Sequence, residues 1–187
     1  MKRTITFFVA ILLVITAFSG CGNADSGKNN SSVNKSYEDA AELLVRLITG
    51  EDLSKSEVRS MQPETLFSKE TEDGISFSEY YEQVQQQIKT NKNAMISAFG
   101  KDYKVSYEIK ADKKISAEEQ HQATKHLNSN TWYDAGDLEE VRVLTLELSV
   151  DGDEIDRTFK GEIQTMKLGK SWYILACDFS ELESFLN

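Results

Sequence analysis

The stretch that decides the fold is Val141–Phe179, which reads VRVLTLELSV DGDEIDRTFK GEIQTMKLGK SWYILACDF. In its first ten residues, Leu144, Leu146 and Leu148 occupy every second position, with a polar residue between each pair. Strict alternation of apolar and polar residues is typical of a strand with one buried face. The stretch therefore predicts a sheet.

Two turn signals divide this stretch into three strands. Asp151–Gly152 closes the first strand, and Gly169 lies between the second strand and the third. Connections this short join antiparallel neighbours. The third strand, Trp172–Phe179, is apolar on both faces, so we expect it at the centre of the sheet.

Upstream of the sheet, two segments carry apolar residues at helical spacing. Tyr37–Thr49 and Phe77–Phe99 each follow a serine with an acidic residue three positions later, and each is followed by a glycine. This serine motif occurs at Ser36, Ser54, Ser76, Ser116 and Ser180. The remaining expected elements are a short helix after Leu53, a strand over Tyr103–Lys110, a weak helix over Ser116–Asn128 and a closing helix or tail over Ser180–Leu186.

The start of the chain has the order of a secretory signal peptide. Met1–Arg3 is basic, Ile5–Phe18 is a run of 14 uncharged residues, and Ser19–Cys21 follows. The run is shorter than the about 20 apolar residues that a membrane span needs. The ending resembles the lipobox of bacterial lipoproteins, with Phe18 in place of the usual leucine.

That resemblance implies that the thiol of Cys21 takes a diacylglyceryl group and that Cys21 becomes the mature N-terminus. An uncleaved anchor and a plain secreted signal are the alternatives. We expect a signal peptide over residues 1–20, a flexible tether over 21–36 and a single α+β domain over 37–187. The predicted location is the cell membrane, with the domain outside the cytoplasm.

The charge of the chain limits its partners. Without residues 1–20, which hold Lys2, Arg3 and no acid, 19 basic residues face 31 acidic ones, a net charge of −12. A domain this acidic offers no broad positive field for phosphate backbones, so we expect no nucleic-acid partner. Contact with the membrane is expected through the lipid on Cys21, and an envelope protein or a small ligand is the further partner considered.

The order of the elements resembles the nuclear-transport-factor-2-like, or cystatin-like, α+β cone, and more narrowly small bacterial lipoproteins that carry domains of this fold. The residues that carry the resemblance are Ala40–Asp52, Met61–Glu64 and Lys167–Cys177. It implies N-terminal helices packed on a curved antiparallel sheet, with a pocket at the open end. The helix expected over Ser116–Asn128 departs from the commonest order of that fold.

Two histidines, an acidic turn and Cys177 are the candidates for a metal or redox site. His121 and His126 are five positions apart, which places them on different sides of a helix. The acidic turn over residues 151–156 lacks the order of a calcium loop. Cys177 has no second cysteine once Cys21 carries lipid, so it is interpreted as a small buried apolar residue. We expect no metal site and no cofactor.

Three functions are compatible with the sequence. The preferred one is a membrane-anchored module that binds a ligand or a protein, and the third is assistance in the folding or assembly of envelope proteins. The second, the main alternative, is a pocket enzyme, because ketosteroid isomerase, a member of the resembled fold, uses a pocket carboxylate as base. Glu147 and Asp178 are the two weak candidates for that base, since a carboxylate inside an apolar cavity has a raised pKa.

Overall fold

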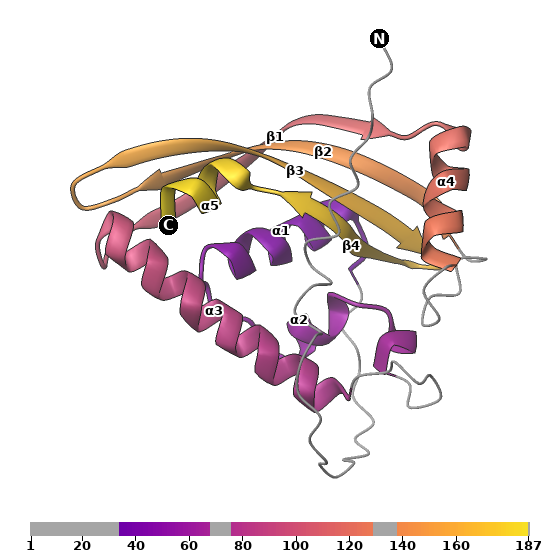
Figure 1. Ribbon diagram of the computed structural model, residues 1–187, viewed down its shortest axis with the longest axis horizontal. Helices are drawn as coiled ribbons and strands as arrows, with labels where there is room; N and C mark the ends of the chain where they lie inside the picture. Colours follow the sequence, from indigo (N-terminus) through magenta and orange to yellow (C-terminus); the bar gives the residue numbers. More distant parts are fainter. Residues whose placement is uncertain (1–33, 68–75, 129–137, 187) are drawn as a thin grey trace.

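The sheet has four antiparallel strands in the order β1-β2-β3-β4, so every strand lies beside its neighbour in sequence. The computed structural model describes residues 34–67, 76–128 and 138–186 (Figure 1). In order, these residues form α1 (Tyr37–Ile48), α2 (Lys55–Ser60), the 3-10 helix η2 (Glu64–Phe67), α3 (Phe77–Phe99), β1 (Lys104–Lys114), α4 (Ala117–Asn128), β2 (Leu138–Asp151), β3 (Asp156–Leu168), β4 (Ser171–Asp178) and α5 (Ser180–Leu186). The predicted α+β class is confirmed.

The strand β1 is longer than predicted. It continues past Lys110 to Lys114, and its register against β2 shifts between Ile109 and Ala111. A bulge of this kind inserts one residue, so the side chains that follow change face. The alternation that identifies Tyr103–Lys110 therefore breaks at the bulge, although the strand continues.

The central position predicted for Trp172–Phe179 is wrong. β4 is an outer strand that pairs with β3, and the central strands are β2 and β3. Its two apolar faces are explained by helices on both sides of the sheet. Trp172 and Ile174 pack in the cluster beneath α1, whereas Tyr173 and Leu175 pack in the cluster beneath α4.

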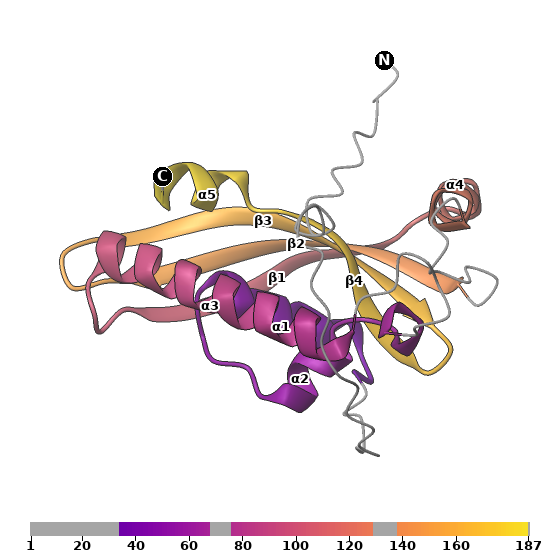
Figure 2. The ribbon, with the colours of Figure 1, turned by 60° about the horizontal axis from the view of Figure 1, so that its bottom comes forward.

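Helices α1, α3 and α5 contribute to one apolar cluster with the face of the sheet that carries Leu144, Leu146 and Leu148, here called the inner face. Figure 2 shows α1 and α3 running across this side of the strands. The long helix α3 continues through Asn91 without interruption. The Asn91 Nδ2 donates to the Leu47 carbonyl oxygen (2.9 Å), which satisfies a carbonyl in the last turn of α1.

The opposite, outer face is covered at one end by α4. Ala123 of α4 packs with Leu138, Val141 and Met166, which alternate with the inner-face residues along β2 and β3. The predicted weak helix over Ser116–Asn128 is thus confirmed and lies against the sheet.

The chain is held at the β4 edge by Asn34. Its carbonyl oxygen accepts from the Trp172 N–H (3.0 Å), and its Nδ2 donates to the carbonyl oxygens of Trp172 (3.2 Å) and Ser60 (2.8 Å). Only 6% of Asn34 is exposed. The first residue that the structure describes, Asn34, is therefore fixed beside β4.

Candidate functional site

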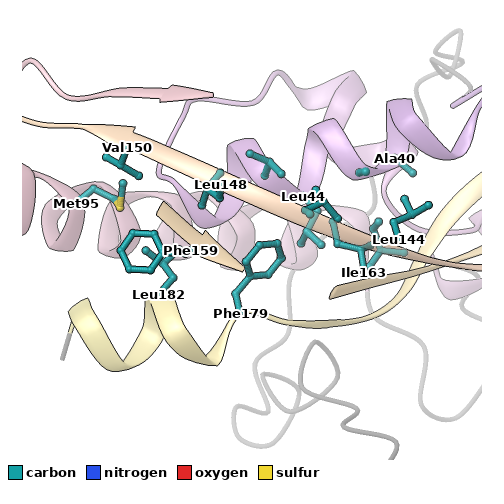
Figure 3. Packing of buried hydrophobic residues seen from close by; sticks show 14 of the residues in the cluster. Ala40, Leu44, Met95, Leu144, Leu148, Val150, Phe159, Ile163, Phe179 and Leu182 are labelled. Atoms are coloured by element: carbon teal, nitrogen blue, oxygen red, sulfur yellow. The ribbon is translucent and has the colours of Figure 1, made fainter. Parts of the chain in front are cut away.

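The interior between the sheet and the helices is occupied by apolar side chains. Figure 3 shows Leu44 of α1 and Met95 of α3 directed toward the sheet, and Phe179 and Leu182 approaching it from the α5 side. The Phe179 ring lies directly over Gly161, where a Cβ atom would come within 2.2 Å of the ring. Here the inner face is packed core.

Glu147 lies on the outer face of the sheet. It is in the middle of β2, and its side chain is 37% exposed. Its Oε1 is 3.4 Å from the Nζ of Lys110, which also pairs with Glu108. A surface carboxylate beside a lysine lacks the apolar enclosure that base catalysis of the isomerase type requires.

Asp178 is the last residue of β4 and is exposed. Its Oδ1 accepts a hydrogen bond from the Ser180 backbone N–H (2.9 Å), at the start of α5. The carboxylate therefore satisfies one of the free amides in the first turn of that helix. The structure does not bring Asp178 and Glu147 together: they lie on different strands, and Asp178 is engaged in a helix start.

Charged residues gather on the inner face beyond the N-terminus of α1. The guanidinium of Arg142 lies over the Tyr37 ring (4.8 Å to the centroid) and pairs with Asp112 and with Glu140 (2.6 Å). Hydrogen bonding to the Glu38 carboxylate, and then to Asp112, raises the pKa of Tyr37 to about 12. Arg142 is already paired with two carboxylates, so its charge is satisfied within the cluster, which holds β1, β2 and α1 together.

Sequence reasoning missed this cluster. Asp112 and Arg142 are 30 positions apart, and the bulge after Ile109 changes the face on which Asp112 lies. No periodicity in the sequence reports such a change of face, so no local signal would have found the pair.

A groove of about 440 Å³ runs along the exposed side of α3. Tyr81 supplies apolar surface beside the buried Ile88, and the charged residues at its rim carry both signs: Asp52, Glu82, Lys89 and Lys92. The Nε2 of Gln85, which also lines the groove, donates to the Leu53 carbonyl oxygen (3.2 Å) and fixes the loop before α2. An open groove with an apolar floor and a rim of mixed charge suits a polypeptide segment better than a small molecule that needs enclosure.

The remaining candidates from the sequence are Cys177, His121 and His126. Burial, followed by the nearby charges of Glu183 and Asp178, raises the pKa of the Cys177 thiol to about 12, so this thiol is a poor nucleophile. His121 is exposed on α4, and the side chain of His126 lies outside the described residues. Within residues 34–67, 76–128 and 138–186, no group of three His, Cys, Asp or Glu side chains is arranged to hold a metal ion.

Cys21 and the signal sequence lie outside the described residues. Among the helices that the structure does describe, none is both long enough and apolar enough to cross a membrane. No protein-family model matches the chain, and no curated protein or solved structure shows significant similarity to it.

Proposed function

We propose that this chain is a bacterial lipoprotein, anchored to the cell membrane through Cys21, whose domain binds a polypeptide segment of another envelope protein. The anchor is supported by the signal sequence that ends in Ser19–Cys21. Two or three acyl chains on one cysteine give lasting attachment, whereas a single chain binds only marginally.

The observation that carries the binding role is the packed inner face. Leu144, Leu146 and Leu148 are fully buried under the helices, so this region holds core where a catalytic cavity would be needed. Both candidate base carboxylates, Glu147 and Asp178, lie at the surface instead. We therefore assign function to the surface and do not propose the isomerase alternative.

We propose further that the domain is of the nuclear-transport-factor-2-like type. The support is the order of its elements, in which N-terminal helices precede a meander of antiparallel strands, and the three register shifts, which bend the strands. The groove along α3 is the proposed binding surface, because it combines apolar area with charges of both signs.

The anchor is tested by metabolic labelling with palmitate. Label should enter the wild-type protein and be absent from Cys21→Ser. Full labelling of the variant would contradict the anchor.

The binding surface is tested by filling the groove. Gln86 and Gln87 are adjacent and both exposed on α3, but only Gln86 lines the groove. Chemical cross-linking in intact membranes should join the wild type to an envelope protein. Gln86→Trp should lose this cross-link, and the matched control, Gln87→Trp, should retain it. If both variants capture the same protein as strongly as the wild type, the groove is not the binding surface.

A further inference from the structure

The sheet has two outer strands, and only one of its two edges is covered within the described chain. At the β4 edge, Asn34 pairs with the backbone of Trp172 through two groups, its carbonyl oxygen and its Nδ2. Beyond the end of β4, α5 lies beside β3, and the Oε2 of its Glu181 accepts from the backbone N–H of Lys160 (2.9 Å). At both ends of this edge, a backbone donor thus meets a partner from the same chain: Trp172 at one end and Lys160 at the other.

The edge of β1 is different. In the part of the chain that the structure describes, β1 pairs with β2 alone. Its inward side chains Val105, Tyr107 and Ile109 are only half-buried, in contrast to the fully buried inner row of β2. An outer strand with a partly exposed apolar row and unpaired backbone groups on its outer side is a template for another strand.

The two halves of β1 differ in how they resist such pairing. The second half carries the bulge and three lysines, Lys110, Lys113 and Lys114. Bulges and lysines on an outer strand hinder its pairing with a strand of another molecule. The first half, Lys104–Ile109, alternates regularly and pairs with β2 in unbroken register. Strand addition is therefore possible at the first half and obstructed at the second.

We propose that Lys104–Glu108 pairs antiparallel with the same segment of a second copy of this chain, about a two-fold axis through Ser106. In this register Lys104 lies opposite Glu108 of the second copy, and Glu108 opposite its Lys104. On the inner face, Val105 lies opposite Tyr107. Opposite charges and an aromatic next to a β-branched residue are the favourable cross-strand pairs, and an isologous contact contains each of them twice.

Charge complementarity selects this register over its neighbour. A two-fold axis through Tyr107 would place Lys104 opposite Lys110, a like-charged pair. Lys104 has no ion-pair partner among the described residues, and the side chain of Glu108 is 70% exposed although it contacts Lys110. Both charges are therefore accessible to a second copy.

The register is tested in membranes that contain the full-length protein. Ser106→Cys places a thiol on the proposed axis, and copper-phenanthroline should oxidise two copies to a disulfide-linked dimer. Lys113→Cys, exposed on the same strand, is the control and should stay monomeric. Absence of the Ser106→Cys dimer, equal cross-linking of both variants, or cross-linking to a different protein would overturn the proposal.

A charge exchange tests the pairing independently of thiol chemistry. In the Ser106→Cys background, Lys104→Glu alone and Glu108→Lys alone each create two like-charged pairs, so dimerisation should weaken about tenfold. The double exchange, Lys104→Glu with Glu108→Lys, recreates opposite pairs and should restore the dimer. If the double variant does not form the dimer, this register is excluded. If the dimer is restored, the single variants had lost the charge pairing and were not misfolded.

Discussion

At the scale of single residues, Glu57 joins the first two helices. Its Oε1 accepts from the Nη1 of Arg46 (2.6 Å), and its Oε2 accepts from the backbone N–H of Ser54 (2.7 Å). Burial alone would raise the pKa of Glu57, but the hydrogen bonds from Ser54 and Arg46 outweigh it and lower the pKa to about 2. The ionised carboxylate therefore belongs to the folded state.

This lowered pKa predicts a loss of stability in acid. A glutamate in the unfolded chain titrates at about pH 4.3, so the contribution of Glu57 is complete above that pH and disappears as the pH falls toward 2. We expect the wild type to lose about 1–2 kcal/mol more free energy of unfolding than Glu57→Gln between about pH 6 and pH 2.5, after allowance for solvent screening. Urea unfolding at several pH values measures this difference, and parallel curves for the two proteins would contradict it.

Residue-scale features were also the most predictable from sequence. The hydroxyls of Ser36, Ser54 and Ser76 accept from the amides three residues on, and the acidic side chains return the bond. Ser116 forms the same pair with Glu119. The closing helix predicted over Ser180–Leu186 is confirmed, but α5 begins at Ser180 itself, and Asp178 accepts from the Ser180 N–H. The four-residue motif thus identifies each helix start, although at α5 a preceding side chain also contributes to the cap.

At the scale of elements, α4 is held more weakly than the other long helices. Of its side chains described, only Ala123 is buried, and the Nε2 of Gln120 reaches the carbonyl oxygens of Leu138 (3.2 Å) and Glu139 (3.1 Å). By comparison, α3 buries four side chains, among them Ile88 and Phe99. Stability from tertiary packing should differ accordingly between the two helices.

We therefore expect backbone amides of α4 to exchange with deuterium well before those at the centre of α3. Local opening needs little apolar surface to be exposed where, as over residues 117–125 of α4, the only buried side chain is that of an alanine. Hydrogen exchange followed by mass spectrometry of peptides from Ala117–Asn128 and Phe77–Phe99 measures this. Equal protection of the two peptides would show that α4 opens only with the whole domain.

The elements themselves were largely predictable, whereas their places in the sheet were not. The bounds of α3 follow from its serine cap, its apolar stripe and Gly100, whose φ of 93° suits glycine. The edge position of β4 was mispredicted because an apolar strand reads the same whether neighbouring strands or packed helices cover it. An apolar pattern in the sequence indicates that a residue is buried, but not whether a strand or a helix covers it.

At the scale of the whole molecule, the candidate surfaces depend on contacts between distant segments. The groove combines Asp52, which precedes α2, with residues of α3, and the cluster at Arg142 joins three elements. Helical and strand periodicities describe one element at a time, so neither surface was visible in the sequence. The anchor at Cys21, by contrast, is a local signal and remains a prediction from sequence.

The same long-range packing predicts that the domain unfolds in one step. Leu144 belongs to the inner cluster and Met166 to the outer one, both fully buried, and the two clusters share the strands β2 and β3. Leu144→Ala and Met166→Ala should each lower the free energy of unfolding by about 2–5 kcal/mol, since each leaves a cavity that packed neighbours fill only in part. Urea unfolding followed by far-ultraviolet circular dichroism and by tryptophan fluorescence should give coincident curves for both variants. An additional, earlier transition in Met166→Ala would contradict unfolding in one step. It would show that the cluster beneath α4 unfolds while β2 and β3 keep their packing on the inner face.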